Sequence, residues 1–216
     1  DLPKLLKKGA LYSGTTTWIF RAGPIVGLGA VLLALTLVPL GNIPAMFSFK
    51  GDFLLVAYLL GVMRFFTVAA ALDTGSSFEG MGASREVQFS ALAEPALLLG
   101  LVAVIRVTGE LSLTQAIAAI STRVWADAGT ALALVLLAWL AVFLAENSRI
   151  PVDDPNTHLE LTMIHEVMVL DHGGPDFACV LYGAVLKMWI LGAFLVGLLA
   201  PVRTGHLLPD LGAGLA

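Results

Sequence analysis

Apolar residues dominate five long stretches of this 216-residue chain, and polar residues gather between them. Each stretch is close to the roughly 20 residues that an α-helix, rising about 1.5 Å per residue, needs to cross the hydrocarbon of a bilayer. The stretches are residues 22–40, 53–72, 87–105, 128–145 and 177–202, and together they hold three of the charged residues. The pattern predicts an all-α, polytopic membrane protein with about five transmembrane helices.

The composition supports a membrane protein and excludes other classes. Hydrophobic residues make up 58% of the chain and charged residues 13%, and the five stretches lack the charged stripes of a soluble helical bundle. The net charge of −4 is spread without a dense basic segment, so we expect no nucleic-acid binding. The single cysteine, Cys179, cannot supply the thiolates of an iron–sulfur cluster. We therefore expect no cofactor in this chain itself.

The segments between the stretches predict an orientation. Lys and Arg crowd the first 21 residues, which we expect to form a surface helix and loop in the cytoplasm. Alternation then places 73–86 and 146–176 on the same side, as loops, while 111–120 should form a short helix that caps the bundle on the other side. No linker or repeat divides residues 1–216, which predicts a single membrane domain. Its start at Asp1 and its closing loop suggest a fragment of a longer subunit.

Three charged residues inside the stretches are the first candidates for chemistry. Arg64, Glu94 and Lys187 lie about 12, 10 and 15 Å from the cytoplasmic ends of their helices, at a 1.5 Å rise per residue. Because a charge within a membrane is costly, side chains at a common depth should face one another and compensate. The pattern fits two interpretations equally, a buried ion pair that fixes helix register and a proton relay.

The loop 146–176 is the most polar part of the chain. Asp154 before Pro155 predicts a helix that runs to about Leu170, with Leu161, Ile164 and Met168 on an apolar face. This amphipathic helix should lie at the membrane interface with its carboxylates facing a partner or a cavity, unless it is a solvated connector.

The start of the same loop predicts a linked polar site. Glu146 and Arg149 are three residues apart, and Pro151 should turn the chain so that Asp153 also reaches the Arg149 guanidinium. Metal binding is not expected in the loop. His165 and Glu166 resemble the start of a zinc-protease motif, but Val169 stands where the second histidine is needed.

Two sequence motifs resemble a known family. The run ENSRIPVDDPNTHLELTMIHEVMVLDHGGPD, residues 146–176, resembles the cytoplasmic loop of the first membrane subunit of respiratory complex I and its hydrogenase relatives. The run LDTGSSFEGMGASREVQFSALAEP, residues 72–95, is similar to the branch of formate hydrogenlyase and other group 4 membrane-bound [NiFe] hydrogenases. With the opening DLPKLLKK, the resemblance covers essentially the whole chain.

The resemblance implies a subunit in the cell's inner membrane that anchors a soluble arm. Its expected partners are a [NiFe] large subunit, an iron–sulfur small subunit and antiporter-like membrane subunits, with the [NiFe] centre and [4Fe-4S] clusters in the arm. Proton coupling would involve the intramembrane charges and the positions that match the family's motif: Arg64, Glu94, Lys187, Glu146, Arg149, Asp153 and Glu160. The arm would dock on the rest of the loop: Asp154, His158, His165, Glu166 and Asp171.

Three functions remain open from the sequence. The first is the anchor and ion-coupling subunit of a membrane-bound hydrogenase. The second is the quinone-chamber subunit of complex I, although Asn156 and His158 stand where that branch tends to have carboxylates. The third, a stand-alone secondary transporter, would often show inverted repeats, and no second half of this chain resembles the first.

Overall fold

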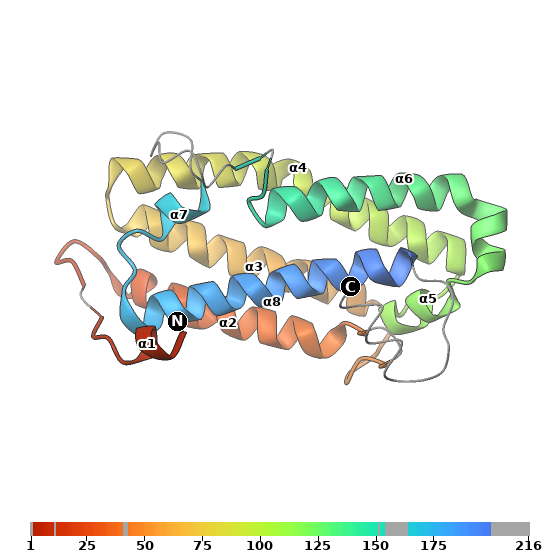
Figure 1. Ribbon diagram of the computed structural model, residues 1–216, viewed down its shortest axis with the longest axis horizontal. Coiled ribbons are helices and arrows are strands. Elements are labelled where there is room, and N and C mark those ends of the chain that lie inside the picture. Colours follow the sequence, from red (N-terminus) through yellow and green to blue (C-terminus); the bar gives the residue numbers. More distant parts are fainter. Residues whose placement is uncertain (1, 11, 41–42, 151, 154–163, 200–216) are drawn as a thin grey trace.

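Five long helices run side by side along the length of the molecule in the computed structural model, which describes residues 2–10, 12–40, 43–150, 152–153 and 164–199 (Figure 1). They are α2 (Trp18–Leu37), α3 (Asp52–Asp73), α4 (Ser77–Thr108), α6 (Thr122–Glu146) and α8 (Gly174–Leu199). Each is long and apolar enough to cross a membrane, which confirms the predicted fold class. Three short helices lie at the ends of the bundle: α1 (Leu2–Leu6), α5 (Leu113–Ala119) and α7 (His165–Met168).

The long helices pack through small and apolar side chains. α2 lies against α3 and α8, and α4 lies against α3 and α6. A Cβ atom at Gly100 of α4 would lie 2.1 Å from Nε1 of Trp139, so only glycine lets α4 and α6 approach this closely. Large apolar side chains such as Leu92, Leu99 and Leu134 remain exposed on the outside of the bundle. Such surfaces suit contact with lipid or with another membrane helix.

The helix α4 is longer at its start than the sequence predicts. It begins at Ser77, whereas the apolar pattern placed a loop over 73–86 and began the helix at Val87. The added turns carry charged and small residues, which hydropathy excludes from a membrane span, and they pack against α7 outside the apolar part of the bundle. A Cβ atom at Gly82 would lie 3.0 Å from the Ile164 carbonyl oxygen and 3.1 Å from Cγ of Met168, so glycine permits this contact.

The helix α6 is bent at one end and ends inside the bundle at the other. Ser121 caps its start, and the chain leaves helical geometry at Ala128, where the predicted apolar span begins. At its other end Figure 1 shows α6 stopping beside the middle of α4. The last residue of α6, Glu146, is buried as a result.

Carboxylates at the ends of α3 fix two neighbouring helices. Asp73 accepts hydrogen bonds from the backbone nitrogens of Thr17 (2.6 Å) and Phe20 (3.3 Å) and so caps the start of α2. Asp52 is fully buried and accepts from the Leu113 backbone nitrogen (2.7 Å) and the Ser112 hydroxyl (2.9 Å), which caps α5. A negative charge at a helix start satisfies free N–H groups and favours the helix dipole. The predicted short helix within 111–120 is confirmed.

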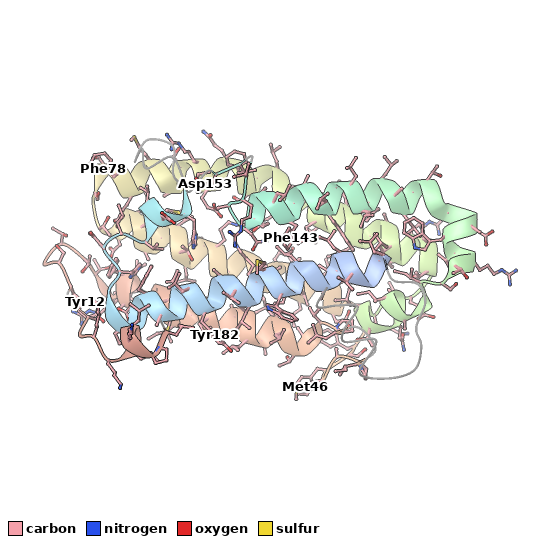
Figure 2. The ribbon with its side chains drawn as sticks, viewed as in Figure 1. Tyr12, Met46, Phe78, Phe143, Asp153 and Tyr182 are labelled. Carbon is pink, nitrogen blue, oxygen red and sulfur yellow. The ribbon has the colours of Figure 1, made fainter. Side chains whose placement is uncertain are left out.

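The N-terminal segment is tied to the start of α8. The Tyr12 hydroxyl donates a hydrogen bond to Asp176 (2.8 Å), and this bond to a carboxylate raises the pKa of Tyr12. The Phe20 ring stacks on the His172 ring at a centroid distance of 4.0 Å. Burial lowers the pKa of His172. Tyr12 therefore lies at the same end of the molecule as α7 (Figures 1 and 2).

Candidate functional site

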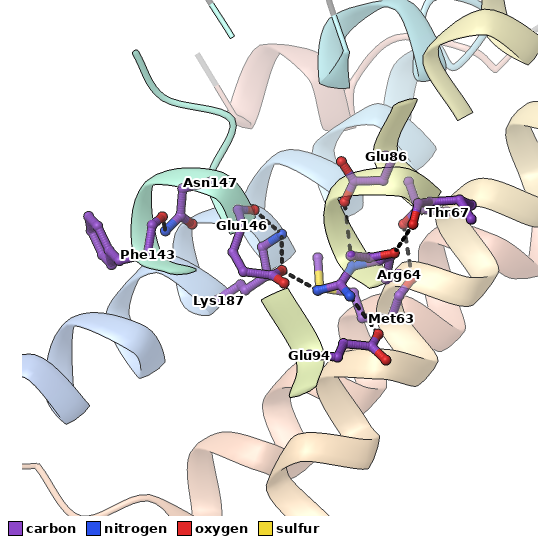
Figure 3. Close-up of polar contacts among 11 residues, drawn as sticks. Met63, Arg64, Thr67, Glu86, Glu94, Phe143, Glu146, Asn147 and Lys187 are labelled. Carbon is purple, nitrogen blue, oxygen red and sulfur yellow. Dashed lines mark hydrogen bonds and ion pairs between the residues drawn. The ribbon is translucent and has the colours of Figure 1, made fainter. Parts of the chain in front are cut away.

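A network of charged side chains crosses the centre of the bundle and is built around Arg64 of α3 (Figure 3). Its Nη1 atom donates to Oε1 of Glu94 at 2.5 Å, and its Nε lies 3.5 Å from Oε1 of Glu86, with both carboxylates on α4. Its Nη2 atom forms an ion pair with Oε2 of Glu146 at the end of α6. One guanidinium thus joins three carboxylates from two helices, which its fixed fork of donors allows.

Lys187 extends this network to a fourth helix. Its Nζ on α8 donates to the backbone carbonyl of Glu146 at 2.5 Å and lies 3.7 Å from Oε2 of the same residue. The carboxylate of Glu146 therefore lies between the two cations, Arg64 and Lys187. The prediction that Arg64, Glu94 and Lys187 face one another is confirmed in part, because Arg64 pairs directly with Glu94 and reaches Lys187 through Glu146.

The sequence did not point to Glu86, which the structure places inside the network. Glu86 lies eight residues before Glu94 on the same helix, so its side chain falls near the same face. The spacing of Glu86 and Glu94 could have indicated this position, but only if the predicted helix had begun before Val87 and so included Glu86. Its side chain is 10% exposed, so it is part of the protein interior.

The network holds more acids than bases. Among the described residues Glu86, Glu94 and Glu146 face two cations, so full ionisation leaves this group with one negative charge more than it has positive charges. Burial is uneven. The Glu146 side chain is 5% exposed and that of Arg64 8%, but 49% of the Glu94 side chain is exposed at the surface of the bundle. A proton bound by one carboxylate would balance the charges.

Two cavities meet at Glu146. The larger has a volume of about 240 Å³ and reaches from Glu146 and Lys187 to Arg149 and Glu166. The smaller, of about 60 Å³, is lined by Arg64, Glu94 and Glu146. Each is large enough to hold water, and each offers polar partners to it. The carboxylate of Glu146 thus has a cavity on either side.

The expected site of Glu146, Arg149 and Asp153 is not found, and that prediction was wrong. Arg149 is exposed, and no hydrogen bond or ion pair joins its side chain to either acid among the described residues. Glu146 instead turns inward to the two buried cations, where the attraction is less screened by water. The Oδ2 atom of Asp153 accepts from the backbone nitrogens of Ile164 (3.0 Å) and His165 (3.4 Å).

The residues predicted to dock the arm divide into two groups. Asp154 and His158 lie outside the described residues, as does most of the predicted amphipathic helix, of which the structure describes α7 alone. Glu160, predicted to take part in proton coupling, also lies outside the described residues. Ile164 and Met168 are buried, as the predicted apolar face requires. Glu166 and Asp171 are exposed, as a docking surface requires.

His165 differs from the other docking residues because it lines the larger cavity. Its Nε2 atom is shielded from solvent and has no hydrogen-bond partner among the described residues. Burial, together with the charge of Lys187, lowers the pKa of His165 to about 4. The imidazole is therefore neutral near pH 7.

The chain resembles known proteins over almost its whole length. The model of the family described as NADH dehydrogenase matches residues 1–204. The chain belongs to the NADH dehydrogenase family. Members of this family that resemble it include "Formate hydrogenlyase subunit 4" and "Hydrogenase-4 component C" of Escherichia coli (strain K12), each 30% identical over 93% of this chain.

A third relative is a subunit of the NADH-quinone oxidoreductase of Verminephrobacter eiseniae (strain EF01-2), which is 26% identical over 96% of this chain. The chain spans 64%, 62% and 61% of the lengths of these three relatives. Among solved structures, the fold is similar to a chain of the membrane-bound sulfane sulfur reductase, an archaeal respiratory membrane complex. The TM-score is 0.78 at 22% identity, over 100% of this chain and 70% of that one.

Proposed function

We propose that this chain is the membrane anchor and proton- or ion-coupling subunit of a complex I-like membrane-bound hydrogenase of the formate hydrogenlyase type. The two hydrogenase relatives support this choice, because each is 30% identical to the chain. In the complete complex a [NiFe] large subunit and an iron–sulfur small subunit form the soluble arm. Antiporter-like subunits continue the membrane domain, which lies in the cell's inner membrane.

The observation that carries the proposal is the charge network of Arg64, Glu86, Glu94, Glu146 and Lys187. It joins four helices at the middle of an otherwise apolar bundle, where isolated charges are costly. Among the described residues this network has one carboxylate more than it has cations, so one of the three carboxylates can hold a proton while the other two balance the cations. The excess carboxylate holds a proton, and the two cavities beside Glu146 let water bring that proton and remove it.

The redox chemistry belongs to the partner subunits in this proposal. The arm docks at the end of the bundle that holds α7 and the start of α8, where Glu166 and Asp171 are exposed. The [NiFe] centre and the [4Fe-4S] clusters are carried by the arm. This chain supplies the surface that holds the arm and the charged groups through which its redox reaction is linked to ion movement.

The quinone-chamber subunit of complex I is the second candidate, and the relative at 26% identity favours it. The two candidates differ in the arm. A hydrogenase arm contains nickel, whereas a complex I arm oxidises NADH and passes the electrons to quinone.

The composition of the native complex tests the proposal. The full-length subunit, tagged and purified in mild detergent from its own cells, should copurify with polypeptides that carry nickel and iron, and the preparation should evolve hydrogen. Complexes that contain iron but no nickel and oxidise NADH would support the second candidate. Isolation as a homo-oligomer without nickel or iron would overturn both.

A further inference from the structure

The larger cavity forms a passage from the surface to the buried charge network, with charged side chains at both of its ends. Two of its lining residues, Arg149 and Glu166, are exposed and mark its outer end. Two others, Glu146 and Lys187, are buried and mark its inner end. At about 240 Å³ the cavity has room for several water molecules, each of which needs two or more polar partners.

Among the described residues that line this passage, His165 is the one histidine. Its position is fixed through the backbone, because Asp153 accepts hydrogen bonds from the Ile164 and His165 nitrogens at the start of α7. Its Nε2 atom is buried yet has no partner within the described part of the chain. A buried polar atom without a protein partner beside a cavity that can hold water is typically satisfied by water.

We propose that His165 exchanges protons between water in the larger cavity and the carboxylate of Glu146. A proton from cavity water binds the neutral imidazole. It then passes, directly or through a second water, to Glu146, and the imidazole returns to its neutral state. This inference rests on the proposed function, and it names the group through which the network takes up its proton.

The charged groups around the passage suit this transfer. Lys187 on α8 disfavours a lasting positive charge on the imidazole, so His165 releases a proton rather than retaining it. Asp153 beside His165 and Glu166 at the outer end attract a proton to the cavity. Among the described residues, the other charged groups near the inner end are Arg64 on α3, Glu86 on α4 and Glu146 on α6, and Arg149 lies at the outer end.

The test uses the intact complex reconstituted in liposomes, with the rate of proton translocation measured per complex. His165→Gln retains a polar side chain that does not titrate, and we expect its rate to fall at least about tenfold, since a positioned acid–base group typically contributes 10²–10⁴-fold. His165→Ala should be equally slow, but added imidazole should restore it in proportion to the imidazole concentration. His172→Gln is the matched control. It removes a histidine of the same loop that stacks on Phe20 away from the cavity, and its rate should stay within twofold of wild type.

Three results would overturn the inference. The first is a His165→Gln complex that translocates protons within twofold of the wild-type rate. The second is a slow His165→Ala complex that imidazole does not restore. The third is loss of assembly in both variants, which would assign His165 to folding. A normal rate in His165→Gln together with a reduced rate in Glu94→Gln would refute only this inference, whereas normal rates in both would refute the proposed coupling.

Discussion

Arg64 should be the residue on which the charge network depends most. Arg64→Gln removes the cation that contacts three carboxylates and leaves Glu86 without a cation in contact among the described residues. Breaking a buried ion pair by removing one partner typically costs about 3 to 5 kcal/mol.

Arg64→Lys should have an intermediate effect. The ammonium keeps the charge but cannot reproduce three contacts made by three nitrogens of a planar group. The loss of one hydrogen bond to a buried charged group corresponds to about 1.5 to 3 kcal/mol. We therefore expect the stability of the complex to decrease in the order wild type, Arg64→Lys, Arg64→Gln.

The assay is the thermal stability and yield of the complex purified in detergent. Arg106→Gln is the control, because Arg106 is an exposed arginine in the last turn of α4 and its replacement should change stability by no more than about 0.5 kcal/mol. An Arg64→Gln complex as stable as the Arg106→Gln control at pH 7.5 would refute the reasoning.

Two further predictions concern the end of the bundle near α7. Because the pKa of His172 is lowered in the folded protein, its stabilising contribution is complete above the unfolded pKa of about 6.5 and decreases as the pH falls below it. His172→Phe keeps the stacking on Phe20 and removes the titration, so thermal stability should fall less between pH 7.5 and 5.5 than in wild type, and an equal fall would contradict this. Gly82→Ala should displace Ile164 and Met168, destabilise the α4–α7 contact by about 1 to 3 kcal/mol and speed proteolysis after α6. In the control Gly80→Ala no atom lies within 4 Å of the added Cβ, so this variant should be cleaved by the protease at the wild-type rate. Equal cleavage rates in the Gly82→Ala and Gly80→Ala variants would count against the α4–α7 contact.

The sequence predicted the membrane helices well because their signal is local. About 20 apolar residues without charges have few alternatives to crossing a bilayer, so all five helices were found. Their ends were less predictable. The start of α4 contains Glu79, Arg85 and Glu86, and the helix includes this polar segment because it packs against α7, as at Gly82, a contact that hydropathy does not report.

Contacts of the candidate site were predictable where they depend on the depth of a residue in the membrane. They were not predictable where they depend on the direction in which a side chain points. Arg64 and Glu94 lie at matching depths on adjacent helices, and they pair. Spacing also suggested that Glu146 would pair with Arg149, which is three residues away. The direction of the Glu146 side chain is set instead by cations on α3 and α8, more than 40 residues away along the chain in each direction.

The central claim, that the charge network carries protons rather than only holding helices together, is tested most directly by Glu94→Gln. Removing this charge leaves two cations with two carboxylates, Glu86 and Glu146, so the structure predicts normal assembly. The measurement is the number of protons translocated per electron pair by the reconstituted complex, with Glu110→Gln, an exposed acid just beyond α4, as the control. We predict a normal yield with strongly reduced proton translocation in Glu94→Gln and wild-type values in the control. A Glu94→Gln complex that translocates protons at the wild-type ratio would contradict the claim and leave the network as a structural ion cluster.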